Sequence, residues 1–85
     1  MVLPLSAHAI FEIERRGISK EEVEQVFNNP EQKIKVSNRR EIWQNKIEVV
    51  GVVYVLRVIV DLEPELRIVT VYRSSKVKKY WRDNS

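Results

Sequence analysis

Two runs of β-branched residues, separated by a short polar turn, constrain the fold of this chain most strongly. The runs are Val52–Asp61 and Leu66–Ser74, and both are dense in Val, Ile, Tyr and Thr, the composition of paired strands. The turn between them contains Pro64, which has no N–H to give to a strand ladder. The sequence therefore predicts an antiparallel hairpin here, and we expect the rest of the chain to pack around it.

Two short helices are expected before the strands. The first is capped by Ser6 and runs to about Arg16, where a glycine follows. The second begins with the capping box of Ser19 and Glu22 and runs to about Asn28. Their apolar stripes are too narrow for the helices to be stable alone, so we expect them to pack on a sheet.

Two further strands are expected between the second helix and the hairpin. Gln32–Ser37 alternates polar and apolar residues, and Glu41–Glu48 is a less regular strand. Ser75–Trp81 follows the hairpin as a short terminal helix or tail. Helices first and strands afterwards predict an α+β fold, with one mainly antiparallel four-stranded sheet and both N-terminal helices on one face. Residues 1–85 are expected to form a single domain.

Composition limits the compartment and the chemistry. The chain has no cysteine, so it can form neither disulfides nor thiolate metal sites. Its longest apolar run, Val49–Leu56, is too short to span a bilayer, and no signal peptide is recognisable. A cytoplasmic protein without a membrane partner, metal or cofactor is therefore expected.

Charge is distributed unevenly along the chain. The net charge is +3, but residues 1–31 carry −3 and residues 67–85 carry +5. This asymmetry indicates either a face that binds phosphates or simply a solvated basic tail.

Three arginines lie within the expected hairpin. Arg57 interrupts an apolar strand on the face opposite the helices, while Arg67 and Arg73 share a face of the next strand. If the strands align suitably, the three guanidinium groups converge and match phosphate oxygens. The alternative is pairing with carboxylates such as those of Glu41, Glu48 and Glu65. Glu65 favours pairing for Arg67, whereas no acidic residue is near Arg57 in the sequence.

His8 and the C-terminal aromatic residues complete the candidates. His8 is the only histidine and lies in the first helical turn, where it is either a general base or a residue without chemistry. One histidine without suitably spaced carboxylates predicts no zinc site. Tyr72, Tyr80 and Trp81 lie among lysines and arginines, an arrangement that suits single-stranded nucleic acid. Alternatively, Tyr80 and Trp81 anchor the tail to the core.

The segments LSAHAIFEIERRGIS, EEVEQVFNNP, LRVIVD and IVTVYRSS, followed by KKYW, carry a family resemblance over Leu5–Trp81. The chain resembles a family of small toxin-like proteins with a domain of unknown function. It is similar to the BrnT-type toxins of toxin–antitoxin pairs, and more remotely to the RelE/ParE superfamily. The resemblance implies a RelE-like fold, in which the sheet is curved and its helix-free face is the active surface.

The same resemblance implies a toxin that is a metal-independent endoribonuclease, an mRNA interferase. A 2′-hydroxyl would attack the adjacent phosphate while Arg57 and Arg73 stabilise the developing charge, and Tyr80 or His8 would move the proton. The expected partners are RNA, including ribosome-bound RNA, and a cognate antitoxin protein. The alternatives are a non-catalytic ParE-like gyrase inhibitor and a nucleic-acid or protein binding module. The RNA backbone would be held by five further basic residues, Arg39, Arg40, Lys76, Lys78 and Lys79.

Overall fold

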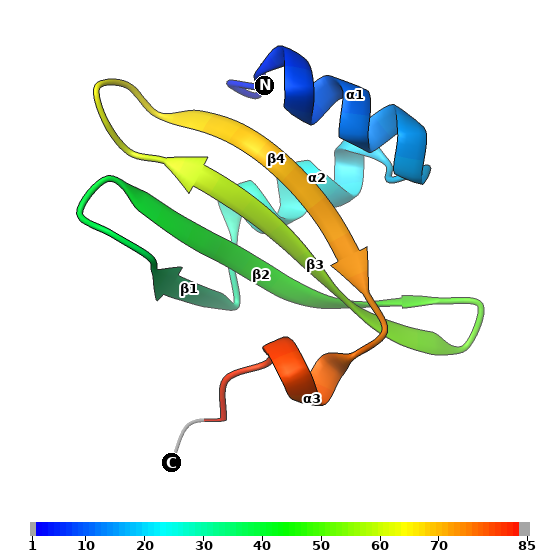
Figure 1. The fold of residues 1–85 in the computed structure, drawn as a ribbon. Helices are drawn as coiled ribbons and strands as arrows, with labels where there is room; N and C mark the ends of the chain where they lie inside the picture. The colour runs from blue at the N-terminus through cyan, green and yellow to red at the C-terminus, as the bar shows by residue number, and fades with distance from the viewer. Residues whose placement is uncertain (1, 84–85) are drawn as a thin grey trace.

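A computed structural model describes residues 2–83 of the chain. Four strands form one antiparallel sheet in the order β1-β2-β3-β4 (Figure 1). Two helices precede the sheet and a short one follows it, which confirms the predicted α+β fold. The elements are α1 (Ala7–Arg16), α2 (Lys20–Asn28), β1 (Gln32–Lys35), β2 (Arg40–Val49), β3 (Val52–Asp61), β4 (Arg67–Ser74) and α3 (Val77–Tyr80).

The predicted caps define both N-terminal helices. The Ser6 hydroxyl accepts a hydrogen bond from the Ala9 amide at the start of α1. Gly17 ends α1 in the left-handed conformation with φ of 64°, which a residue without Cβ adopts easily. Ser19 and Glu22 form the complete capping box of α2. The same Ser6 hydroxyl donates to the Val69 carbonyl, which fixes the start of α1 to β4.

The hydrophobic core lies between the sheet and the two N-terminal helices. Leu56, Val58 and Val60 of β3 are fully buried there, so the predicted helix-facing side of the central strand is confirmed. Both helices, the turn between them and the other long strands contribute further core residues, namely Ala9, Ile13, Ile18, Val23, Val26, Trp43, Ile68 and Val71.

The register between β3 and β4 decides where the arginines lie. Arg57 pairs with Tyr72 and Leu56 pairs with Arg73. Because directly opposed residues of an antiparallel pair project to the same side, Arg73 lies on the helix side with Leu56, and Arg57 lies on the other. The expected convergence of Arg57 and Arg73 is therefore wrong.

A bulge explains the position of the third arginine. The register shifts between Ile59 and Val60, so that Thr70 and Ile68 pair with consecutive residues of β3 and Val69 is the extra residue. Arg67 is thereby moved to the Arg57 side of the sheet, but it pairs with Glu65 at 2.8 Å. The expectation that Arg67 pairs with this carboxylate is confirmed.

The last residues of β2 and the first residues of β3 form a two-stranded ribbon that extends past the rest of the sheet (Figure 1). The pairing of β4 with β3 stops at Val55, while β2 and β3 stay paired to Val49 and Val52. The turn at the tip is formed by Val50 and Gly51, with φ values of 48° and 78°. Val50 is 97% exposed, so the tip presents an apolar, β-branched side chain to solvent in a conformation that favours glycine.

Candidate functional site

Arg57 lies in the middle of the sheet on the side that α3 partly covers. Only 7% of its surface is exposed, and it takes part in none of the ion pairs among residues 2–83. Arginine is almost never buried without a partner, because removing a charge from water is costly. The groups around its guanidinium therefore define the candidate site, which we call the Arg57 cluster; it consists of Gln32, Gln44, Arg57, Tyr72 and Tyr80.

Neutral groups hold the guanidinium in place of a carboxylate. Nε of Arg57 donates to Oε1 of Gln44 at 2.9 Å, and Nη1 donates to the hydroxyl of Tyr72. The guanidinium carbon also lies 4.4 Å from the ring centroid of Tyr80 and 5.5 Å from that of Tyr72. Cation–π contacts of this kind are worth about 0.5–2 kcal/mol each, depending on their exposure. Hydrogen bonds and aromatic faces thus hold the charge without neutralising it.

Gln44 connects the arginine to the C-terminal segment. Its side chain is fully buried, and its Nε2 donates to Oε1 of Gln32 at 2.7 Å and to the carbonyl of Tyr80 at 3.0 Å. Gln32 in turn accepts from the Arg82 amide at 3.1 Å and donates to the Arg82 carbonyl. The amide chain from β1 and β2 therefore fixes α3 and Tyr80 over Arg57.

Gln32 and Gln44 were not among the candidates from the sequence. Their positions in the sheet identify them. Gln44 is a polar residue in the middle of β2, directly opposite Arg57, and Gln32 of β1 lies opposite Gln44. That signal exists only once the strand register is known.

The cluster keeps free hydrogen-bonding capacity. Nη2 of Arg57 makes no hydrogen bond within residues 2–83, yet no buried side-chain nitrogen or oxygen of those residues lacks a partner. Nη2 is therefore not completely buried. The Tyr72 hydroxyl accepts from Arg57, which leaves its own proton available. A permanent cation beside a phenol proton is suited to binding an anionic oxygen.

Basic residues border this cluster. Lys79 lies 5.2 Å from the Tyr80 ring, and Arg16 reaches from the end of α1 to 5.9 Å from the Tyr72 ring. Lys76 and Lys78 are exposed on the α3 segment. Of the predicted basic residues, Lys79 therefore lies beside Tyr80, and Lys76 and Lys78 are exposed on the same segment.

The other predicted catalytic residues lie elsewhere. Arg73 stacks on Tyr54 at 5.5 Å, on the helix side of the sheet. His8 has an exposed side chain in α1, and its Nε2 lies 3.9 Å from the Glu12 carboxylate. Neither residue contacts Arg57, so the structure brings only Arg57 and Tyr80 of the four together.

The β1–β2 turn places Arg39 and Arg40 away from the cluster. Arg40 lies four residues before Gln44 on β2, about 13 Å along the strand. It makes two hydrogen bonds to the Asp61 carboxylate, at 2.6 and 3.2 Å, which lower the pKa of Asp61. Arg39 lies 3.8 Å from Glu63. Both arginines are therefore engaged by acids, unlike the lysines of α3.

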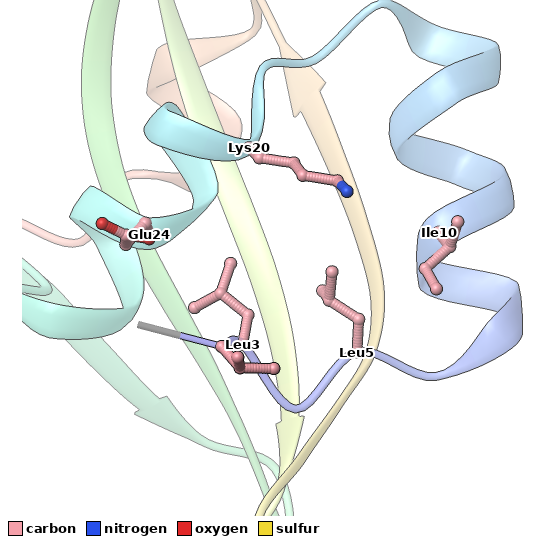
Figure 2. Close-up of a pocket in the computed structure, with 6 residues that line it drawn as sticks. Leu3, Leu5, Ile10, Lys20 and Glu24 are labelled. Carbon is pink, nitrogen blue, oxygen red and sulfur yellow. The ribbon is translucent and has the colours of Figure 1, made fainter.

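A separate pocket of about 380 Å³ opens on the helix side of the molecule (Figure 2). Leu3, Leu5 and Ile10 give it apolar walls between the N-terminal segment and α1. Lys20 extends across the opening from α2, where Glu24 also lies. This pocket is remote from the Arg57 cluster, because the sheet separates the two sides.

Metal-ligand clusters and membrane-spanning helices were also considered for the described part of the chain. Residues 2–83 contain no group of three or more His, Cys, Asp or Glu side chains that could hold a metal ion. None of the helices in that range is long and apolar enough to cross a membrane.

Comparison with known proteins identifies one family. A family model described as "Domain of unknown function (DUF4258)" matches residues 5–73, from before α1 almost to the end of β4. No curated protein and no solved structure matches the chain. The relation to BrnT and RelE toxins therefore stays a prediction from the resemblance.

Proposed function

Since the chain belongs to the DUF4258 family, a domain of unknown function, we propose its function from the site itself: the Arg57 cluster binds the backbone of single-stranded RNA. The observation that carries the proposal is that the guanidinium of Arg57, a residue only 7% exposed, has no carboxylate partner within residues 2–83. An arginine that only supported the fold would be expected to have an acidic partner. An arginine without one keeps its full charge for an anionic ligand.

Phosphate is the anion that fits this geometry. Nη2 of Arg57 and the proton of the Tyr72 hydroxyl are two donors to one phosphate, and donation from a charged group strengthens the contact. Lys76, Lys78 and Lys79 add a cationic border along which a strand can continue.

Aromatic rings beside these donors favour single strands over duplexes. Tyr72 and Tyr80 meet edge to face with their centroids 6.1 Å apart, and Trp81 follows directly. Unpaired bases can stack on such rings, whereas the bases of a duplex are already stacked on each other. A strand that places a phosphate at Arg57 would have bases within reach of these rings.

In more detail, we propose that the protein is the toxin of a toxin–antitoxin pair and cleaves the bound RNA without a metal. Arg57 would stabilise the charge on the phosphorus during attack by the 2′-hydroxyl, an effect typically worth about 3 kcal/mol for one donor. The 2′-hydroxyl would lose its proton to solvent water as its bond to phosphorus forms. The bond from phosphorus to the 5′-oxygen would break, and Tyr72, already oriented by Arg57, would give its proton to that leaving oxygen and regain one from water. Arg73 has no role in this form, because it lies across the sheet. An acidic segment of an antitoxin would cover the same basic face.

Binding is tested by fluorescence anisotropy with a labelled twelve-nucleotide RNA over a series of salt concentrations. Removing the charges of Lys78 and Lys79 by substitution with alanine should weaken binding about 10-fold and reduce the salt slope by roughly 1 to 2. The matched control removes two lysines of β1, Lys33 and Lys35, and should leave the affinity within twofold. Equal losses in both variants would show that the binding is not specific to the α3 side.

Cleavage is tested separately with Tyr72→Phe, which keeps the ring and removes the hydroxyl. The variant should lose RNA affinity by only about fivefold, the effect of one neutral hydrogen bond. It should lose cleavage of total RNA and of ribosome-bound RNA by ~10²-fold or more. Unchanged cleavage excludes the assigned role of Tyr72. Intact transcripts with DNA damage in expressing cells would instead indicate a gyrase inhibitor, and RNA binding without cleavage or growth defect would leave a binding module.

A further inference from the structure

A second concavity lies beside the Arg57 cluster, between the end of β2 and α3. It has a volume of about 360 Å³ and is lined by Lys46, Val77, Lys78, Trp81 and Asp83. Pockets that hold small ligands begin at about 300 Å³, so this space can accept a single planar group. We call it the Trp81 pocket.

The Trp81 pocket is continuous with the site already described. Lys46 lies two residues beyond Gln44 on β2, so both side chains project to the same side of the sheet, about 7 Å apart along the strand. Trp81 directly follows Tyr80, whose carbonyl is held by Gln44. A strand with a phosphate at Arg57 would therefore bring a neighbouring base to this pocket.

The lining combines an aromatic wall with opposite charges at its rim. The ammonium of Lys46 lies 4.6 Å from the centroid of the Trp81 ring, which fixes the orientation of the indole. Lys78 is a second cation at the rim. An indole in a pocket that two lysines also line suits a base with flanking phosphates.

Asp83 is the unexpected member of this lining. It is the only acidic residue between positions 67 and 85, and it lies in the pocket with two lysines. Among residues 2–83, however, no ion pair within 4 Å joins Asp83 to Lys46, to Lys78 or to any other cation. Within residues 2–83 its carboxylate accepts no hydrogen bond and forms no ion pair, and it is the one negative charge in the lining of this pocket.

A free carboxylate in a nucleic-acid site repels phosphate and attracts hydrogen-bond donors. An ionised carboxylate has two acceptor oxygens and no donor. Among the four RNA bases, guanine alone presents two adjacent donors on its Watson–Crick edge, the N1–H and the 2-amino group. Adenine, cytosine and uracil each present one donor there, next to an acceptor that the carboxylate would repel.

We propose that the Trp81 pocket is a nucleobase site that selects guanine, with the base against Trp81 and its Watson–Crick edge on Asp83. This inference rests on the proposed RNA binding and adds a base preference to it. Arg57 holds the backbone without regard to sequence, and Asp83 reads the base.

The test compares three labelled eight-nucleotide RNAs by anisotropy: UUUUUUUU, UUUUGUUU, and the same oligonucleotide with inosine in place of guanine. Inosine retains the N1–H and lacks the 2-amino group. The unaltered protein should bind the guanine oligonucleotide about 10-fold more tightly than oligo-U, with inosine between them.

Asp83→Asn should bind guanine and uracil oligonucleotides within twofold of each other, since an amide presents one acceptor and one donor group. Glu14→Gln removes the same charge from the exposed side of α1 and should leave the preference unchanged. Trp81→Ala should weaken binding of all three oligonucleotides, and Trp81→Phe should restore it in part.

The outcomes separate the two proposals. Equal affinity of the unaltered protein for all three oligonucleotides overturns the guanine site and leaves RNA binding at Arg57 intact. A guanine preference that survives Asp83→Asn also overturns it. Absence of binding to any RNA overturns the proposed function, and the guanine site with it.

Discussion

Arg57 and Gln44 lie opposite each other in the middle of the sheet. Both are buried, and a hydrogen bond joins their side chains. Oε1 of Gln44 accepts from the guanidinium, while its Nε2 is used by Gln32 and by the Tyr80 carbonyl. A glutamate in place of Gln44 would neutralise Arg57 and would lack the amide donor for Tyr80. At the residue scale, glutamine at position 44 therefore leaves the charge of Arg57 unneutralised and holds the Tyr80 carbonyl, whereas glutamate would do neither.

Val50 has a backbone conformation that valine rarely adopts. Its φ of 48° is costly for a β-branched side chain, by about 1–2 kcal/mol. Val50→Asn should therefore stabilise the chain by about 1 kcal/mol, because asparagine adopts this conformation readily and is favoured next to glycine in tight hairpin turns. Thermal unfolding followed by circular dichroism should show a rise of about 4–8 °C.

The control for this prediction is Val53→Asn, in the same ribbon but within β3. Val53 is 44% exposed and has an ordinary strand conformation, so asparagine there should give no gain. A melting temperature that is unchanged or lower in Val50→Asn would contradict the inferred strain.

At the scale of elements, local signals in the sequence predicted the helices and the strands well. The serine caps, Gly17 and the capping box act within four residues, and the structure contains each of them as expected. The face of Arg57 followed from alternation within β3 alone. The position of Arg73 did not, because it depends on how two strands align. A pattern within β4 cannot show that Val71 pairs with Val58.

The first helix shows a similar limit at its surface. The apolar pattern of the first helix predicts Ile10 in a buried stripe with Ile13 and Glu12 on the outside, but Ile10 is 40% exposed and Glu12 only 7%. Hydrogen bonds from Arg16 and then Arg15 lower the pKa of Glu12 and allow its carboxylate to lie under them. The buried residues of α1 are therefore Ala9, Glu12 and Ile13. A search for apolar residues cannot find Glu12, because its burial depends on two arginines that cover it.

Arg40 at the start of β2 and Asp61 at the end of β3 form an ion pair, which predicts a pH dependence of stability. Arg40 lowers the pKa of Asp61 below its unfolded value, so the pair stabilises the fold above about pH 4 and the benefit is lost as the pH falls further. Asp61→Asn should therefore unfold at lower urea concentration than the unaltered chain at pH 6, and the difference should shrink towards pH 3.

Glu63→Gln is the control for this pair. Glu63 and Arg39 are both largely exposed and 3.8 Å apart, so the substitution should change the urea midpoint little at either pH. A midpoint difference for Asp61→Asn that stays constant between pH 6 and pH 3 would show that the carboxylate charge has no part in it.

At the scale of the whole molecule, the sheet separates the hydrophobic core from the proposed binding surface. The principal extents of 37 × 32 × 19 Å describe a thin body, with the core and its two helices on one side of the sheet. The Arg57 cluster, α3 and the Trp81 pocket lie on the other side. Charge follows the same division along the chain, from −3 in residues 1–31 to +5 in residues 67–85. Stability and binding are therefore expected to respond to different substitutions.

The most direct measurement compares RNA affinity in Arg57→Lys and Arg73→Lys, with melting temperatures to confirm folding. Both variants keep the charge and lose the guanidinium fork, one on each side of the sheet. We predict at least 10-fold weaker binding for Arg57→Lys and a change within twofold for Arg73→Lys. Equal losses, or a loss confined to Arg73→Lys, would contradict the assignment of RNA binding to the Arg57 side.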